Sequence, residues 1–215
     1  MKMTRLPIRS VAPLEPLARD RILDAADRAL AAEGYRHMRI EDLARAAAIA
    51  KGTVYLSFQS KEEIALACID RMAGRVLARM RVLAAEAKPA DERLRRMLIE
   101  RVLVRFDYAR AHSASVDEIL GAIRPALLTR REAHFRAESK LLAAVLSGPG
   151  GAKPGPADLA TAQAMVLATN ALLPYSLGVR EMGRRAEIAR RADRVARLVI
   201  HGVHAARPHR PRRTS

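Results

Sequence analysis

Apolar and polar positions along the chain recur with the spacing of α-helices. Apolar residues return every three or four positions from about Leu17 to Glu33, which predicts a first helix. Two short helices are predicted next, at about 40–47 and 51–57, with a very short connection between them. Ser60 and Glu63 then form a capping box that opens a long helix. No stretch alternates with the period of a strand and no segment repeats, so the chain is predicted to be all-α.

The second half of the chain continues as long helices. A stripe from Leu94 to Ala109 predicts a helix after the break at Pro89, and Ser115 with Glu118 forms a second capping box. Further helices are predicted from Pro125 to about Leu146, over about 158–180 and over about 184–205. Pro174 is predicted to kink the second of these. Residues 147–157 have the composition of a flexible loop.

Residues 40–64 have the arrangement of a helix-turn-helix unit, whose second helix enters the major groove of DNA. The small side chains of Ala46, Ala47 and Ala48 allow the two helices to approach at the turn. The residues spaced to pack the inner side are Ile40, Leu43, Ala44, Ala47, Ile49, Val54 and Phe58. The outer face of the second helix then presents Lys51, Gly52, Thr53, Tyr55 and Ser57. Ammonium and hydroxyl donors suit phosphates and base edges, and glycine lets the backbone approach. A plain helical hairpin within a bundle is the alternative.

This region resembles the TetR/AcrR family of bacterial transcriptional regulators. The motifs that carry the resemblance are Arg21-Ile22-Leu23-x-Ala25-Ala26, Gly34-Tyr35, Asp42-Leu43-Ala44, Lys51-Gly52-Thr53-Val54-Tyr55, and Phe58-x-Ser60-Lys61-Glu62-Glu63-Ile64. The match covers about residues 17–64, and the remaining helices fit the family in number and length. The resemblance implies that Lys51, Gly52, Thr53 and Tyr55 meet DNA and that Lys61 contacts a phosphate. Ser57 stands where the family often has a longer phosphate-contacting side chain.

Three positions depart from the family's pattern. His37-Met38-Arg39 and Ala50 stand where the family usually has a hydroxyl-bearing residue before each short helix, so both helices are expected to lack a side-chain N-cap. Ala48 replaces the usual glycine of the turn. These changes affect the details of base contact rather than the fold.

For the second half, the resemblance implies a pocket for a small-molecule effector and a homodimer formed through the last two helices. The helix at 158–180 is apolar on more than one side, which suits a helix buried by both the core and a partner. The candidate pocket residues are Phe106, His112, His134, Phe135, Asn170 and Tyr175, each with core packing or an internal hydrogen bond as its alternative. The remaining lining is expected to be generic Leu, Ala, Met and Val, with few polar groups to specify a ligand.

Composition and charge narrow the function classes. The 215 residues carry 39 basic and 23 acidic side chains, a net charge of +16, which favours a polyanionic partner. A GC-rich genome is a second source of this arginine excess. Aromatic residues make up only 3% of the chain, which argues against stacking platforms for single-stranded nucleic acid. The single cysteine excludes an internal disulfide and a cysteine zinc site.

The motifs of enzymes are absent from the sequence, which has no G-x-S-x-G, P-loop, G-x-G-x-x-G or H-E-x-x-H. No cofactor or metal is therefore expected; His201 and His204 alone make a weak metal pair. No apolar run reaches the length of a membrane helix and no signal peptide precedes the chain, so a cytoplasmic protein is expected.

The sequence therefore predicts an all-α regulator with four segments. They are a basic arm (1–16), a helix-turn-helix DNA-binding domain (17–63), a helical effector-binding and dimerisation domain (64–205), and a basic tail (206–215). Its partners would be a palindromic operator in double-stranded DNA, a second copy of the chain and a small effector, with repression the expected mode. Two alternatives stay open: a sequence-tolerant architectural DNA-binding protein, and a helical interaction protein with a vestigial DNA-binding head.

Overall fold

The computed structural model describes residues 16–113, 116–148, 153–174, 181 and 183–206, and this part of the chain contains helices and no strand. The helices are α1 (Pro16–Ala32), α2 (Ile40–Ala46), α3 (Lys51–Ser57), α4 (Lys61–Ala84), α5 (Ala90–Ala111), α6 (Val116–Leu146), α7 (Pro156–Asn170) and α8 (Arg185–Ala206). The predicted all-α class, with a helix-turn-helix unit before a larger helical part, is confirmed. Within the described helices, none is long and apolar enough to span a membrane.

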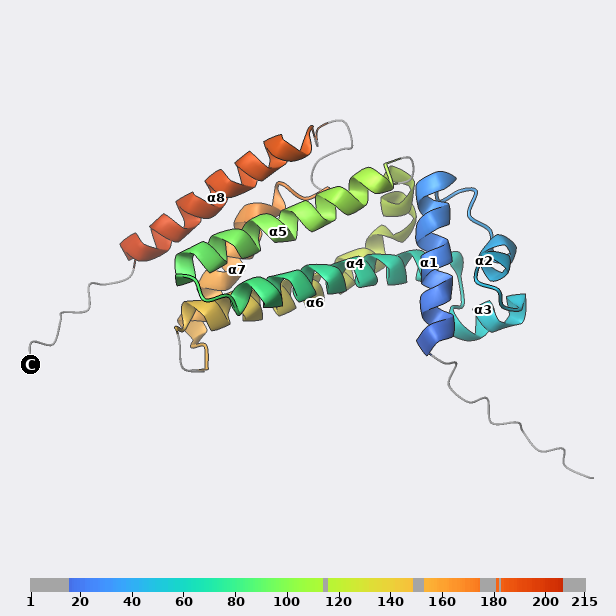
Figure 1. Cartoon of the computed structure of the whole chain (residues 1–215), viewed down its shortest axis with the longest axis horizontal. Coiled ribbons are helices and arrows are strands. Elements are labelled where there is room, and N and C mark those ends of the chain that lie inside the picture. The colour runs from blue at the N-terminus through green and yellow to red at the C-terminus, as the bar shows by residue number, and fades with distance from the viewer. Residues whose placement is uncertain (1–15, 114–115, 149–152, 175–180, 182, 207–215) are drawn as a thin grey trace, which may run out of the picture.

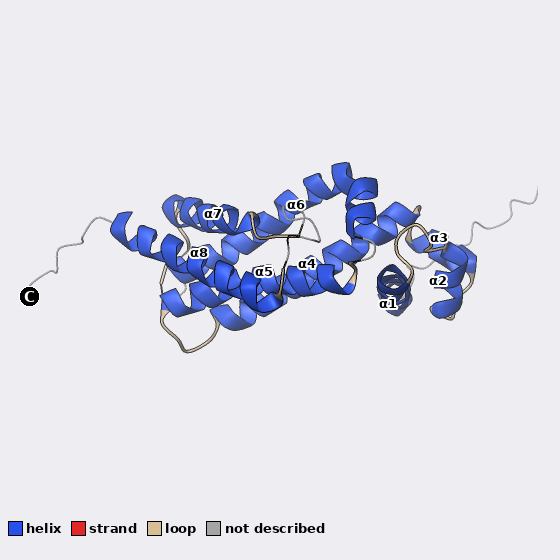
Figure 2. Ribbon diagram, turned by 90° about the horizontal axis from the view of Figure 1, so that it is seen from above, coloured by secondary structure: helices blue, strands red, loops and turns tan. Residues whose placement is uncertain are grey.

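The molecule is elongated, with two parts placed end to end (Figure 1). Helices α4 to α8 form a bundle, hereafter the bundle, in which α4 and α5 lie side by side and α8 packs on the outer side of α5. Helix α1 stands across one end of this bundle, and α2 and α3 lie beyond it. We call α1, α2 and α3 the head. The view from above shows the same order of parts (Figure 2).

The head is held together by an apolar core that its sequence pattern predicts. Ile22, Leu30, Val54 and Ile64 are fully buried in one cluster that joins α1, α3 and the start of α4. Of the residues expected on the inner side, Leu43, Ala44, Ala47, Val54 and Phe58 are buried, and Ile40 and Ile49 pack against them partly buried. Burying these side chains seats α3 firmly, so that its opposite face is left toward solvent.

The two short helices lack side-chain N-caps, as their sequence predicts. Neither Arg39 before α2 nor Ala50 before α3 makes a side-chain capping bond. Ser60 does cap α4, since its Oγ accepts the Glu63 N–H at 3.1 Å. The Glu63 carboxylate accepts the N–H of Gln59 at 2.7 Å, one residue earlier than a standard capping box requires. The junction of head and bundle is therefore fixed at the start of α4.

Ala48, in the turn between α2 and α3, has a φ of +53°, the left-handed region that favours glycine. We expect Ala48→Gly to stabilise the protein by about 1 kcal/mol, because the Cβ strain of a non-glycine residue is removed. The measurement is the free energy of unfolding in urea. Ala78→Gly, at an exposed position inside α4, is the matched control and should destabilise by about 0.5–1 kcal/mol. A lower stability for Ala48→Gly would contradict the strain argument.

Two helix boundaries in the bundle differ from the predicted ones. Pro125 does not start a helix but lies inside α6, which begins at Val116. A proline removes one backbone hydrogen bond and bends a helix without necessarily ending it. On either side of the bend, Ile119 and Ile123 are buried in the head cluster, and Leu142 is buried in the bundle core. The bend directs the first turns of α6 toward α1 (Figure 2).

Helix α7 ends at Asn170 instead of continuing with a kink to about 180. The proline ring of residue 174 would clash with the carbonyl of residue 170, and proline has no N–H to bond it. Residues 171–174 make tighter turns instead, with the Leu172 N–H bonded to Thr169 O at 3.2 Å and the Leu173 N–H to Asn170 O at 3.1 Å. Ser115 of the second predicted capping box lies outside the described residues. Its partner Glu118 bonds Arg36 of the head.

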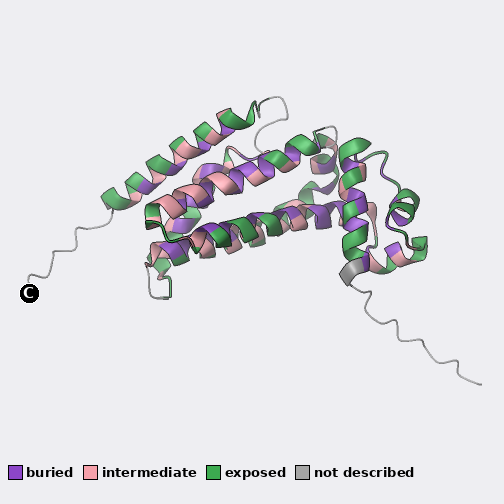
Figure 3. Cartoon of the chain, in the orientation of Figure 1, coloured by how far each residue is buried: buried purple, intermediate pink, exposed green. Residues whose placement is uncertain are grey.

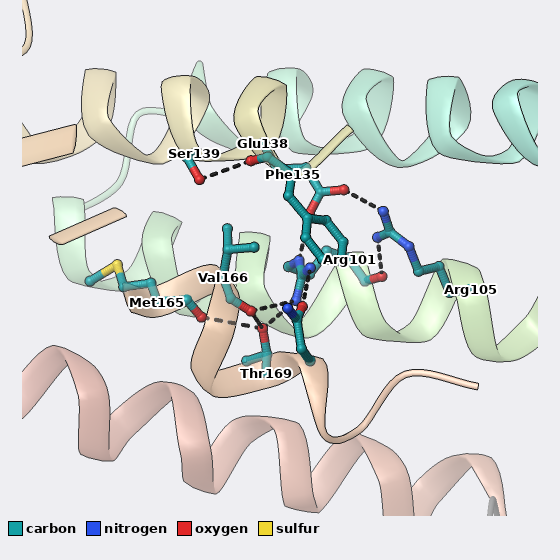
Figure 4. A network of polar contacts seen from close by, with 9 residues as sticks. Arg101, Arg105, Phe135, Glu138, Ser139, Met165, Val166 and Thr169 are labelled. Carbon is teal, nitrogen blue, oxygen red and sulfur yellow. Dashed lines mark hydrogen bonds and ion pairs between the residues drawn. The ribbon is translucent and has the colours of Figure 1, made fainter. Parts of the chain in front are cut away.

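A buried polar network ties α5, α6 and α7 together (Figure 4). Arg101 and Glu138 are both fully buried, and the Arg101 Nε donates to Glu138 Oε2 at 2.7 Å. Arg105 donates to the other carboxylate oxygen of Glu138. Thr169 Oγ1 and Asn170 Oδ1, on α7, accept from the other nitrogens of Arg101. One buried carboxylate thus pairs with two guanidinium groups from α5.

Candidate nucleic-acid interface and ligand cavity

Helix α3 presents a polar outer face that suits contact with a polyanion. Lys51, Gly52 and Tyr55 are exposed, Thr53 is half-buried, and Val54 points into the head core. A Cβ added at Gly52 would meet no atom within 4 Å, so this glycine lies on an open surface. The outer surface of α2 and α3 is largely exposed (Figure 3). All five residues predicted on this face are therefore at least partly exposed around one short helix.

Lys51 pairs with an acidic neighbour on the preceding helix. Its ammonium forms an exposed ion pair with Glu41 and lies 5.9 Å from the centre of the Tyr55 ring. Hydrogen bonding to Lys51 lowers the pKa of Glu41, and the same contact raises the pKa of Lys51. Water screens such exposed pairs strongly, so a phosphate can replace Glu41 as the partner of Lys51.

Lys61 is the first residue of α4 and is half-buried. Its Nζ donates to the Arg36 carbonyl at 3.0 Å and sits 4.5 Å from the centre of the Tyr35 ring. Burial lowers the pKa of Lys61, and the neighbouring Glu62 opposes that shift only in part. An ammonium has three donors, so one bond to Arg36 leaves capacity for an incoming phosphate.

Ser57 differs from the sequence expectation. Its Oγ is buried and has no hydrogen-bond partner among the described residues. Its carbonyl accepts from Arg19 NH1 at 3.2 Å, and the Arg19 guanidinium lies 4.2 Å from the centre of the Phe58 ring. Ser57 therefore anchors the end of α3 to α1 through its backbone and does not present its hydroxyl on the outer face.

The bundle contains a cavity bounded by α4, α5 and α6. Of the predicted pocket residues, His134 and Phe135 line it. The other lining residues are Ile69, Met72, Ala73, Arg105, Tyr108, Ala109, Ile119, Leu120, Leu127, Arg131 and Pro174. A concave, mostly apolar site with a few polar groups is the usual form of a small-molecule pocket.

The other predicted pocket residues lie elsewhere. Phe106 is buried among residues of α5 and α8, off the cavity wall. His112 stacks on Tyr108 with ring centres 4.0 Å apart, and its Nε2 lies 3.2 Å from Asp27 O. Asn170 is engaged with Arg101 at 3.0 Å. Tyr175 lies outside the described residues. Core packing and internal hydrogen bonding, the stated alternatives, describe Phe106, His112 and Asn170.

Sequence reasoning missed the charged part of the cavity wall. Arg105 and Arg131 line it, although generic apolar side chains with few polar groups were expected. The signal was present in α5, where Arg101 and Arg105 fall at helical spacing after the buried Leu94 and Leu98. An arginine in register with an apolar stripe points to a buried ion pair, and its partner Glu138 lies on another helix.

Two residues of the cavity wall also contact the head. The Tyr108 hydroxyl donates to Asp27 Oδ1 of α1 at 2.9 Å. Ile119 is buried in the same apolar cluster as the head residues. Asp27 also accepts from Arg71 of α4 at 2.6 Å. The base of the head thus rests directly on side chains that enclose the cavity.

Comparison with known proteins identifies the head. Residues 22–68 match the family of bacterial regulatory proteins called the tetR family. The fatty acid metabolism regulator protein of Bacillus subtilis (strain 168) is 34% identical over 73 residues, which is 34% of this chain and 38% of that protein. The chain therefore aligns with well under two thirds of the length of this curated relative.

Solved structures extend the similarity to the whole fold. A transcriptional regulator from Rhodococcus sp. Rha1 superposes with a TM-score of 0.58 at 19% identity, over 86% of this chain and 96% of that one. A protein whose structure explains control of antibiotic production by a bacterial hormone gives 0.56 at 25% identity, over 85% and 95%. The match to the tetR family over residues 22–68 lies where the motifs indicated the resemblance.

Proposed function

We propose that the chain is a DNA-binding transcriptional regulator that acts as a homodimer on a palindromic operator and leaves it when a small molecule occupies the bundle cavity. The observation that carries the proposal is the seating of α3, whose inner side is buried while Lys51, Gly52 and Tyr55 face outward. A recognition helix needs this division to enter the major groove without disturbing its own core.

The proposed contacts are divided between bases and phosphates. Lys51 and Thr53 lie at the N-terminal part of α3, the part that reaches base edges in helix-turn-helix proteins. The hydroxyl of Tyr55 and the ammonium of Lys61 donate to phosphate oxygens on either side. Ser57 is left out because its hydroxyl is buried.

The proposed dimer uses α7 and α8. Leu167 on α7 and Leu198 on α8 are each 66% exposed in the single chain. Large apolar side chains left in water at this level are typical of interaction surfaces. Two heads related by a two-fold axis would meet two half-sites about 34 Å apart, which gives the operator its palindromic form.

The proposed response to an effector runs through the cavity wall. A ligand in contact with Tyr108 and Ile119 would move side chains that also contact α1 and the head core. A small shift of the heads is enough to lose the match to both half-sites at once. Repression is proposed as the mode, because a protein seated on a promoter blocks access to it.

Selection from a pool of random duplex DNA at about 150 mM salt tests the proposed function. We expect the full chain to enrich one palindromic sequence. Retention of all sequences alike would favour a sequence-tolerant DNA-binding protein, and no retention at low salt would favour a protein that no longer uses its head. Either result would reject the proposed regulator.

A further inference from the structure

We infer that the cavity of the bundle takes an organic carboxylate with an apolar body, so that the effector is an amphiphilic acid. This inference rests on the proposed function for its role in regulation, but its binding chemistry follows from the cavity wall alone.

Within the part of the chain that the structure describes, the ionisable side chains that line the cavity include basic residues and no acidic one. Arg105 and Arg131 line the cavity, together with His134 and the hydroxyl-bearing Tyr108, and none of the described lining residues is acidic. Arg105 is 4% exposed, so its guanidinium lies in a poorly hydrated place. A charge held away from water attracts a counter-charge far more strongly than an exposed one does.

The acidic residues behind this wall are already shared. Glu138 serves both Arg101 and Arg105. Asp70 faces His134 at 3.1 Å and also pairs with Arg130. Asp27 accepts from Tyr108 and from Arg71. Each of these carboxylates therefore lies outside the lining of the cavity, where Arg105 and Arg131 present the charge that a bound carboxylate would meet.

The rest of the wall fixes the body of the ligand. Ile69 and Met72 of α4 and Leu120, Leu127 and Phe135 of α6 offer apolar surface. Burying an alkyl or aromatic group against this surface is favourable because it removes apolar area from water. The same surface has no hydrogen-bonding groups for a sugar or a nucleotide. The planar fork of a guanidinium matches the two oxygens of a carboxylate. An acid with a single apolar body therefore fits both parts of the wall.

The test is direct binding of probe amphiphiles to the full chain without DNA, followed by calorimetry. The acids are hexanoate, decanoate and 4-phenylbutanoate, and the matched controls are 1-decanol and decyltrimethylammonium, all below their micelle concentrations. We expect at least one acid to bind about ten-fold or more tightly than 1-decanol, with the cation weakest. Equal binding of acid and alcohol, stronger binding of the cation, or no binding of any acid would overturn the inference.

Two variants on α6 locate the site. Arg131→Gln should weaken binding of the preferred acid about ten-fold, whereas Lys140→Gln should leave it unchanged, because Lys140 is exposed on the same helix and does not line the cavity. Equal losses in both variants would also overturn the inference. Arg105→Gln is a second variant, used only if its thermal unfolding remains cooperative, and it should abolish the preference for the acid over the alcohol.

The binding result and the regulatory result can fail separately. If the selected operator exists but no acid binds the chain, the carboxylate inference is wrong and the proposed regulator stands. If an acid binds with the expected preference but no operator sequence is enriched, the inference stands and the proposed function is wrong. Release of a labelled operator by the preferred acid would support both.

Discussion

Replacing Glu138 with glutamine is expected to cost about 3–5 kcal/mol of the free energy of unfolding, because two buried guanidinium groups would lose their common counter-charge. Arg101 is fully buried and Arg105 is 4% exposed, so water cannot take over the role of the carboxylate without opening the bundle. Glutamine keeps the size of the side chain, which separates the loss of charge from the creation of a cavity. Chemical unfolding followed by circular dichroism measures the effect.

The matched control is Glu132→Gln, an exposed glutamate on the same helix, which should change stability by less than about 0.5 kcal/mol. The pH dependence gives a second check. Burial alone would raise the pKa of Glu138, but the charges of Arg101 and Arg105 outweigh it and hold the pKa below its ordinary value of 4.5. The stabilisation by this carboxylate is therefore complete above pH 4.5 and is lost as the pH falls through the lowered pKa. A difference below about 1 kcal/mol at neutral pH would contradict the assignment.

Tyr55→Ala is expected to weaken binding to the selected operator roughly 100-fold. A hydrogen bond to a charged group contributes about 1.5 kcal/mol, and the proposed dimer makes this contact twice, for a total of about 3 kcal/mol. Tyr55 is 49% exposed, so its removal should leave the head folded. Fluorescence anisotropy with the operator and with a scrambled duplex measures the change.

Tyr55→Phe distinguishes the hydroxyl from the ring, and we expect it to account for most of the loss. The matched control is Leu128→Ala, a large exposed side chain on α6, which is not one of the head helices; this variant should bind the operator as the wild type does. An unchanged affinity for Tyr55→Ala, with thermal unfolding also unchanged, would remove Tyr55 from the proposed interface.

The head could be predicted closely because its signals are local. The bounds of α3 at Lys51 and Ser57, the absence of caps at Arg39 and Ala50, and the special position of Ala48 all follow from neighbouring residues. The burial of the Ser57 hydroxyl could not be predicted in this way. The end of α3 contacts α1 there through Arg19, which lies 38 positions earlier in the chain.

The cavity was harder to predict because its polar side chains come from different helices. His134 and Phe135 were identified, but Arg105 and Arg131 were not, since arginine in an amphipathic helix is ordinarily a surface residue. The effects of Pro125 and Pro174 on their helices were also hard to predict. Each proline removes a backbone hydrogen bond, yet α6 continues through Pro125, because residues on both sides of it are packed, whereas α7 ends before Pro174.

In the proposed regulator, the hydrogen bond from Tyr108 to Asp27 links the binding of ligand to the binding of DNA. Because this bond joins the cavity wall to the head, any preference of the ligand for one position of the heads must be matched by a preference of DNA for one state of the cavity. An operator-bound dimer would then hold its ligand more weakly than a free dimer does, by the same factor. The free dimers would saturate first, and the concentration of ligand that clears the promoter would rise with the number of binding sites in the chromosome.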